Sequence, residues 1–333
     1  MSYYIGIDVS KHTLDVAIVE NGSVVLEERI DNEKGAVKKF LLGLKEKLCV
    51  ALSEIVVCME HTGIYNNKAL EVLHRHEVKV CLEPALQIKL SQGMTRGKDD
   101  KVDARRIAVY AYKNREQLVF WRPQRESFQK LQALLTLRER LIKVQKQLRV
   151  PLQESIDFMP SGIVKPLKGS CKPIIDLVGR KLHELDAQIT AIVKADQEIK
   201  KQYNHAVSVP GVGPMIALHM IIRTDGFKKL NDPKKFACYA GVAPFKYQSG
   251  SSIRGKTKVS KLGNMKIKTL LSLGATSAVT YSPEFKQYYE RKIAQGKKPL
   301  CVINAVRNKL ITRVFACVQQ ERNYQKNYHH ALA

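Results

Sequence analysis

The pattern of hydrophobic positions predicts a strand-rich first third of the chain. Five short runs are alternating or continuously apolar, and three longer stretches repeat apolar residues every three or four positions. Residues 55–59 are apolar throughout, which is typical of a strand covered on both faces. Asn21-Gly22 favours a tight turn between paired strands. We therefore expect strands at residues 3–9, 13–19, 23–30, 55–59 and 78–82, and helices at 32–48, 69–76 and 99–112.

The order of these elements indicates a fold class. Three strands joined by hairpins, followed by alternating helices and strands, is the order of an RNase H-like (RuvC-like) α/β sheet. In that topology the strands at 3–9 and 55–59 are neighbours, although they are distant in the chain. The helix at 99–112 can then close over the ends of both strands.

The middle of the chain predicts two amphipathic helices whose apolar residues are spaced alternately by three and four, as in a coiled coil. These residues are Leu134, Leu137, Leu141, Val144 and Leu148, then Ile175, Val178, Leu182, Leu185, Ile189 and Ile192. Prolines end helices, so Pro151, Pro160, Pro166 and Pro173 predict a long loop that joins two antiparallel helices. The hairpin would space domains or mediate dimerisation. Alternatively, both helices pack only on their own domain.

The remainder, residues 204–333, is expected to be mostly helical with loops rich in glycine and lysine. We therefore predict an α/β plus α protein in four parts. They are a catalytic domain (1–123), a helical coiled-coil hairpin (124–203), a mostly α-helical C-terminal domain (204–325) and a frayed tail (326–333).

Charge is distributed unevenly along the 333 residues. Lysine and arginine number 56 against 31 acidic residues, a net charge of +25. Residues 1–110 are neutral, residues 111–199 carry +6 and residues 200–333 carry +19. Such asymmetry is typical of proteins that bind nucleic acid; the alternative is a merely basic surface. The hydrophobic content of 44% excludes a disordered or collagen-like chain.

Cysteine usage and the N-terminus indicate a compartment. The seven cysteines are scattered without a Cys-x-x-Cys pair, so we interpret them as small buried residues in a reducing environment. The first residues lack the features of a signal peptide, and no apolar run reaches about 18 residues. We expect an intracellular protein without a membrane partner.

Four carboxylates are the first candidates for chemistry. Asp8 and Glu60 end two strands that the topology makes neighbours, and Asp100 and Asp103 share one face of the following helix. Converging carboxylates repel one another unless cations neutralise them, and a pair of Mg²⁺ ions suits oxygen ligands and phosphodiester chemistry. For any one of these residues, a solvated surface position or a helix cap is the alternative. Asp99, for example, could cap the helix that begins at Asp100.

Two further segments could contact phosphates. Residues 209–214, Val-Pro-Gly-Val-Gly-Pro, resemble a helix-hairpin-helix turn that presents backbone N–H groups to DNA, or form a plain turn between helices. Residues 246–256 are expected to form a flexible loop in which three serines lie between lysines. The window 228–268 holds ten lysines, one arginine and one acidic residue. Its serines supply a nucleophile, only hydrogen-bond phosphate, or belong to a plain solvated loop, and the sequence shows no base that would activate a serine.

Taken together, these motifs resemble the DEDD transposases of insertion sequences, which are relatives of the Piv DNA invertase. The resemblance extends over residues 3–318. It rests on Ile-Gly-Ile-Asp8, on residues 58–65 (Cys-Met-Glu-His-Thr-Gly-Ile-Tyr), on residues 98–105 (Lys-Asp-Asp-Lys-Val-Asp-Ala-Arg), on the glycines Gly211 and Gly213, and on residues 247–255 (Tyr-Gln-Ser-Gly-Ser-Ser-Ile-Arg-Gly).

The resemblance implies a function and residue roles. It places the catalytic, metal-binding tetrad on Asp8, Glu60, Asp100 and Asp103, and a nucleophile that forms a 5′-phosphoserine link to DNA on Ser249. It implies Mg²⁺, two ions with Mn²⁺ as a substitute, and an element-encoded bridge RNA that pairs with double-stranded donor and target DNA. It also implies a homo-oligomer, a dimer that assembles to a tetramer, in the bacterial cytoplasm and nucleoid. The residues expected to bind nucleic acid are Gly211, Gly213, Lys246, Ser251, Ser252, Arg254, Lys256, Lys258 and Lys261.

Three other functions compete with this interpretation. A metal-dependent RuvC-like nuclease or Holliday-junction resolvase would use the same carboxylates without serine catalysis. An actin-like sugar kinase also begins with a strand such as Ile5-Gly6-Ile7-Asp8, but no second phosphate motif follows. A nucleic-acid-binding protein with a decayed site would not be expected to keep all four carboxylates.

Overall fold

The structure is a computed structural model that describes residues 3–91, 99–249, 253–260 and 262–326. The chain divides into two compact units, Met1–Pro123 and Gln124–Ala333. Within the described residues, no helix is both long enough and apolar enough to cross a bilayer.

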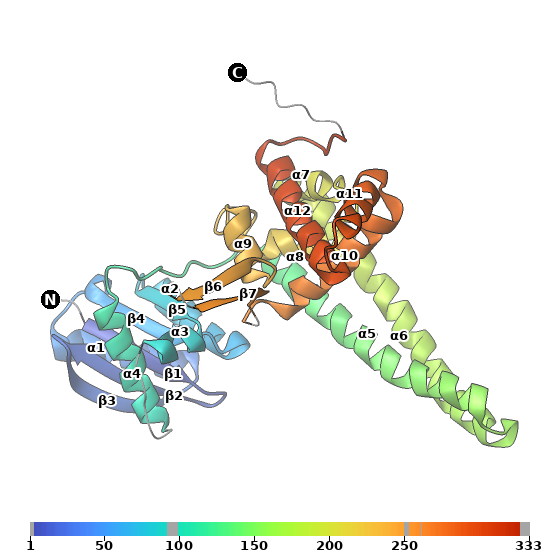
Figure 1. Ribbon diagram of the computed structural model, residues 1–333. Helices are drawn as coiled ribbons and strands as arrows, with labels where there is room; N and C mark the ends of the chain where they lie inside the picture. Colours follow the sequence, from blue (N-terminus) through green and yellow to red (C-terminus); the bar gives the residue numbers. More distant parts are fainter. Residues whose placement is uncertain (1–2, 92–98, 250–252, 261, 327–333) are drawn as a thin grey trace. The chain divides into compact units, whose positions relative to one another are not determined.

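A five-stranded mixed sheet forms the centre of the first unit (Figure 1). Its strands lie in the order β3-β2-β1-β4-β5; the first three pair antiparallel, whereas β1, β4 and β5 run parallel. The predicted adjacency of the first and fourth strands is therefore confirmed. The strands are β1 (Tyr3–Val9), β2 (Thr13–Glu20), β3 (Ser23–Asp31), β4 (Ile55–Glu60) and β5 (Lys79–Glu83).

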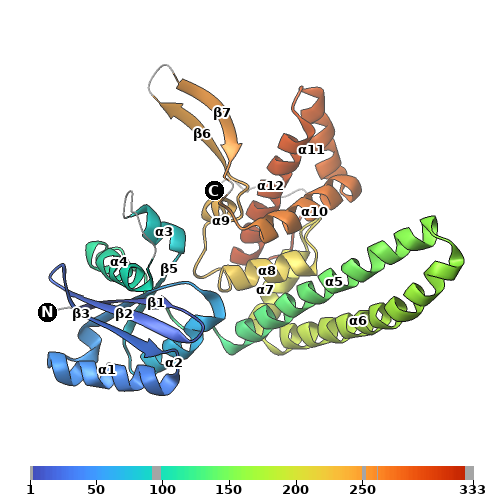
Figure 2. The same cartoon turned by 90° about the horizontal axis from the view of Figure 1, so that it is seen from below.

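Helices cover both faces of this sheet (Figure 2). On one face, α1 (Lys34–Leu48) and α2 (Asn67–Arg75) bury an aliphatic layer that includes Ile5 and Ile7. On the other face, α4 (Asp100–Lys113) and the short α3 (Ala85–Leu90), which we did not predict, pack against Tyr4, Ala17 and Cys58. Alternate residues of β1 thus point to opposite helical layers, as strand geometry requires.

Gly6 allows α4 to lie directly against β1. A Cβ atom at this position would lie 2.2 Å from the carbonyl oxygen of Ala104 and 2.3 Å from the backbone nitrogen of Ala108. Both neighbours are backbone atoms, so a larger residue would push the helix away from the sheet.

Gly6→Ala is therefore expected to destabilise the protein by about 3 kcal/mol, because a clash with backbone atoms cannot be relieved by the movement of a flexible side chain. A urea titration monitored by circular dichroism measures this loss. Gly43→Ala is the matched control, since its Cβ meets nothing within 4 Å inside α1. That change should stabilise the protein by about 0.5–1 kcal/mol. Equal stabilities for Gly6→Ala and wild type would contradict the close packing.

Two long helices begin the second unit and form an antiparallel hairpin (Figure 2). They are α5 (Glu126–Phe158) and α6 (Ser161–Ala195), and only Met159 and Pro160 separate them. The predicted long loop is wrong, because the helices continue through Pro151, Pro166 and Pro173. All three prolines are exposed, so water can satisfy the carbonyl groups that they leave free. Leu137 and Val144 are also exposed, so the packing departs from the seam predicted by spacing, and coiled-coil geometry remains a prediction.

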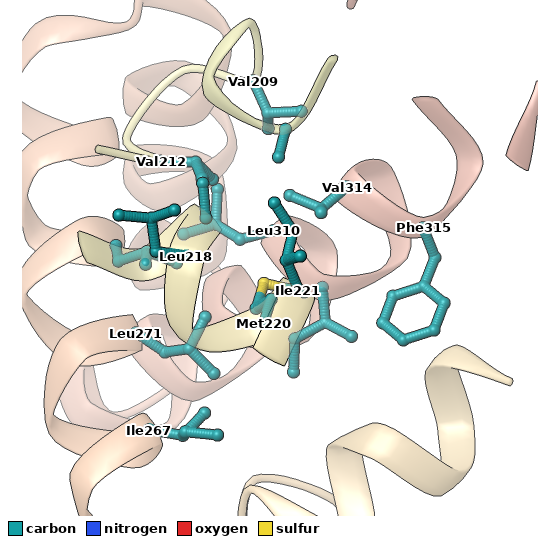
Figure 3. Packing of buried hydrophobic residues seen from close by; sticks show 14 of the residues in the cluster. Val209, Val212, Leu218, Met220, Ile221, Ile267, Leu271, Leu310, Val314 and Phe315 are labelled. Carbon is teal, nitrogen blue, oxygen red and sulfur yellow. The ribbon is translucent and has the colours of Figure 1, made fainter. Parts of the chain in front are cut away.

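The rest of the second unit is a helical bundle with one β ribbon. Its helices are α7 (Gln197–Val207), α8 (Pro214–Arg223), α9 (Pro233–Tyr239), α10 (Met265–Tyr281), α11 (Pro283–Ala294) and α12 (Pro299–Gln319). Leu218 and Ile221 of α8 pack among Leu271 of α10 and Leu310 and Phe315 of α12 (Figure 3). Beyond α12, the chain is still attached to the bundle at Tyr324, whose backbone N–H donates to the Ser208 hydroxyl at 2.8 Å.

Candidate functional site

Four carboxylates form a row across adjacent strands of the sheet. Asp8 faces Asp15 in the antiparallel β1–β2 pair, and Glu60 faces Glu83 in the parallel β4–β5 pair. Because Ile7 is level with Met59 between β1 and β4, Asp8 and Glu60 lie side by side. Residues opposite one another project from the same face of a sheet. This row therefore joins four strands at the carboxyl ends of β1, β4 and β5.

Helix α4 adds two carboxylates to this row. It lies on the face to which Gly6, and therefore Asp8, belongs. Asp100 and Asp103 occupy its first turn, just before the Ala104 carbonyl that contacts Gly6. The Asp99 carboxylate accepts a hydrogen bond from the Lys101 N–H and caps the helix, the role that the sequence suggested for it.

The electrostatics of Asp8 show how close these groups are. Burial, followed by the negative charges of Asp100, Asp103, Glu60 and Asp15 in that order, raises the pKa of its carboxyl from 3.8 to about 6. Removing water disfavours the charged form of an acid, and neighbouring negative charges do the same. Asp8 is therefore a partly buried carboxylate that lies among other negative charges.

Two arginines offset part of this negative charge. The Arg29 guanidinium donates to both carboxylate oxygens of the buried Asp15, at 2.8 and 2.9 Å, and lies 3.6 Å from an Asp100 oxygen. Arg106 donates to Asp103 at 2.8 Å. The carboxylates that face Asp8 from α4 are thus paired with cations that a metal ion would have to outcompete.

Three residues of this region were missed by sequence reasoning. Asp15, Glu83 and Arg29 lie next to the four predicted carboxylates, and Glu83 accepts a hydrogen bond from the buried Cys81 thiol at 3.2 Å. The sequence carried no signal for Asp15, because regular pairing across the predicted hairpin would place Glu28, and not Arg29, opposite it. Glu83 follows an apolar strand as Glu60 does, which was the signal for that residue.

The carboxylate set fits a divalent cation by its chemistry. Within the residues described, no three histidine, cysteine, aspartate or glutamate side chains are already arranged to hold an ion together. Yet Asp8, Glu60, Asp100 and Asp103 supply only oxygen ligands, and the pKa of Asp8 is raised by burial and by neighbouring negative charge, both of which a cation would offset. These four residues would hold the ion after their side chains adjust. A bound divalent ion would supply Lewis acidity at a phosphodiester.

The predicted serine lies in the second unit, apart from the carboxylates in the chain. The segment expected to be a flexible loop is instead a two-stranded antiparallel ribbon of β6 (Pro244–Ser249) and β7 (Ile253–Val259). Alternating β-branched and polar residues in 253–259 were the missed signal. Ser249 ends β6 and pairs with Ile253. The predicted Lys246 lies in β6, and Arg254, Lys256 and the exposed Lys258 lie in β7. Ser251, Ser252 and Lys261 lie outside the described residues.

The two candidate glycines have different surroundings. Gly211 has a φ of +86°, and a Cβ there would lie 2.5 Å from the Gly274 carbonyl oxygen of α10. It is therefore needed for helix packing. Gly213 precedes Pro214 at the start of α8 and has open space around its Cβ position. Of the two glycines, Gly213 is the one that has room beside its Cα atom for a phosphate.

The mixed sheet has the order β3-β2-β1-β4-β5, and carboxylates lie at the ends of its central strands and on the helix that covers them. This arrangement defines the class of RNase H-like enzymes, which act on nucleic acids. Comparison with known proteins narrows this class. The DEDD transposase model of the IS110 kind, described as "Transposase", matches residues 5–158, and the model described as "Transposase IS116/IS110/IS902 family" matches residues 203–290.

Relatives found by sequence comparison agree with these matches. The chain is 25% identical to a pilin gene-inverting protein of Moraxella bovis over 98% of both chains. It is 24% identical to the transposase for insertion sequence element IS1111A of Coxiella burnetii, over 68% of each. A solved structure of T. thermophilus RuvC in complex with a Holliday junction substrate matches 36% of this chain and all of RuvC, with 13% identity and a TM-score of 0.28.

This chain belongs to the IS110 family of DEDD transposases. It is an enzyme of the transposase and site-specific recombinase class. The family assigned from the sequence motifs is thereby confirmed.

Proposed function

We propose that this transposase cuts and rejoins DNA through a serine-linked intermediate, and that an RNA encoded by its own element selects the donor and target sites. The observation that carries the proposal is the gathering of Asp8, Glu60, Asp100 and Asp103 at one end of the sheet, where burial and the charges of the other three raise the pKa of Asp8. The serine and RNA parts rest on the family resemblance of residues 247–255.

In the proposed reaction, the Ser249 hydroxyl oxygen attacks the phosphorus of a DNA phosphodiester. A phosphoserine ester forms at the 5′ side, and the 3′ oxygen leaves and takes up a proton. Rejoining reverses the step, as a 3′-hydroxyl from the exchanged strand attacks the phosphoserine and the serine oxygen leaves. Each step breaks one phosphorus–oxygen ester bond and forms another, so no nucleotide cofactor is consumed.

The carboxylates contribute by holding charge next to the phosphate. Asp8, Glu60, Asp100 and Asp103 would bind divalent cations, Mg²⁺ in the cell and two in number, and thereby permit an anionic phosphate to approach a negatively charged site. Arg29 and Arg106 keep Asp100 and Asp103 oriented near Asp8. The proposed partners are double-stranded donor and target DNA, the bridge RNA and further copies of this chain, from dimer to tetramer.

Distribution of charge supports RNA-guided targeting. The carboxylate unit is close to neutral over residues 1–110, whereas residues 200–333 carry +19. Most of the binding energy would then come from contacts with the phosphate backbone, which do not read base sequence. Base pairing with a guide RNA would supply the missing specificity.

A reconstituted recombination reaction tests this function. It contains purified protein, RNA transcribed from the ends of the element, donor and target duplexes, and Mg²⁺ or EDTA. We expect recombinant junctions only with RNA and Mg²⁺ together, and a changed RNA guide should redirect them to the matching new target. Metal-dependent strand breaks at unchanged sites without RNA would instead indicate a metal-dependent nuclease of the resolvase type.

A further inference from the structure

The hairpin helix α6 carries a row of basic side chains on one face. Lys165, Lys168, Lys172 and Arg180 follow one another at intervals of three, four and eight residues, which places them on the same side of the helix. All four are exposed. In the part of the chain that the structure describes, none of them forms a salt bridge, unlike neighbouring Lys181, which pairs with Glu184 at 2.8 Å. No salt bridge among the described residues therefore explains the positive charge of this row.

The same residues line a shallow groove of about 530 Å³. Its lining belongs entirely to α6 and comprises Lys165, Lys168, Gly169, Lys172, Pro173, Asp176 and Arg180. Gly169 has open space where a Cβ would lie, so the floor between the lysines is low. The groove therefore presents cations around a surface that a backbone can approach closely.

Charge near the groove is strongly positive. Residues 140–181, the outer half of the hairpin, contain nine basic residues and three acidic ones. Asp176 is the one acidic residue among those that line the groove. A field of this sign attracts polyanions and needs no specific partner chemistry beyond phosphate.

We propose that this face of α6 is a second nucleic-acid-binding surface, which binds the sugar–phosphate backbone and does not read bases. From Lys165 to Arg180 the helix rises about 22 Å, at 1.5 Å per residue. That length matches roughly six steps along one strand at 3.4 Å each. Three of the four cations are lysines, flexible point charges that suit phosphate contact better than base recognition. The surface lies outside residues 200–333, the part of the chain in which the charge distribution predicted the nucleic-acid contacts.

The test is binding of full-length protein to fluorescent 30-base-pair DNA and to a structured RNA, measured by anisotropy across salt concentrations. The variant combines Lys165→Gln, Lys168→Gln and Lys172→Gln, which preserves helix propensity. We expect affinity for one or both probes to fall about 10- to 100-fold, and the slope of log affinity against log salt to flatten by about 2 to 3. The probe that loses affinity identifies whether this face binds DNA or RNA.

Two further variants keep the test specific. Lys130→Gln, Lys181→Gln and Lys194→Gln together remove the same charge from the same hairpin outside the groove, and Lys130 and Lys181 are already paired with glutamates. This control should change affinity less than about threefold. Gly169→Glu leaves every lysine in place but adds a carboxylate to the groove floor, so it should also weaken binding.

Equal losses in the groove and control triples would refute a local surface, as would full affinity in Gly169→Glu. Circular dichroism verifies that each variant keeps its helix content. The readout is binding in EDTA, so it is independent of serine chemistry. A failure of the recombination assay would leave this inference standing, and the reverse also holds.

Discussion

Replacement of Asp8 by asparagine is expected to abolish DNA cleavage while making the metal-free protein more stable. Loss of one carboxylate from the proposed cation site should slow strand exchange by about a thousandfold or more, which corresponds to roughly 4 kcal/mol of activation free energy. The recombination reaction with Mg²⁺ measures this loss. The change is nearly isosteric, so the sheet and α4 should remain in place.

The stability change follows from the raised pKa of Asp8, about 6 against an ordinary value of 3.8. Between about pH 4 and pH 6 the folded state binds more protons than the unfolded state, so the stability of wild type falls as pH rises through this window. Above it the full penalty is present, about 1 kcal/mol after allowance for solvent screening of a half-exposed group. Asp8→Asn removes the penalty, so melting in EDTA should occur a few degrees higher at pH 7.5 and at the wild-type temperature at pH 4.

Asp31→Asn is the matched control for Asp8, because Asp31 is an exposed carboxylate at the end of β3. It should change neither activity nor melting temperature. If Asp8→Asn melted lower than wild type at pH 7.5, Asp8 would be a structural residue and not the centre of a repulsive cluster.

Substitution of Ser249 by alanine is expected to remove every covalent protein–DNA adduct. A hydroxyl that forms the intermediate has no substitute, so recombination should fall at least about 10⁴-fold. Ser249 ends a short exposed ribbon away from the helical core, so RNA and DNA affinity should remain within about twofold. The measurement is capture of DNA that stays attached to denatured protein, followed by sequencing of that DNA.

Ser251→Ala and Ser252→Ala are the controls, because they remove the same group two and three residues away. Both should retain the adduct. Adducts that persist in Ser249→Ala but vanish in one of these variants would move the nucleophile to the other serine. Absence of adducts in wild type, with Asp8-dependent breaks still present, would favour metal-dependent hydrolysis.

The glycines and the prolines of this chain differ in how far they determine the fold. Gly6 and Gly211 are both positions at which another helix approaches the backbone, α4 in the first unit and α10 in the second. The prolines of α5 and α6 suggested breaks that do not occur, because an exposed helix face tolerates the loss of a backbone hydrogen bond. Packing between the two helices outweighs the local cost.

Sequence alone determined the strands and the longer helices of the first unit, the nomination of four carboxylates and the family. Strand and helix periodicities are local, and the motifs around Asp8, Glu60, Asp100 and Asp103 are short and specific. The helix-capping role of Asp99 also followed from its position. These features depend on residues within a few positions of one another.

Only the tertiary structure decided which charges meet. A bulge between Ile18 and Val19 shifts the β2–β3 register by one residue, so Asp15 faces Arg29. A regular continuation of the Asn21-Gly22 turn would have placed Asp15 opposite Glu28. Likewise, the ladder between β4 and β5 sets Glu83 beside Glu60, and the continuation of α6 through Pro166 and Pro173 aligns its basic row. Register and helix continuity depend on long-range packing, and a one-residue shift changes every pair across a strand.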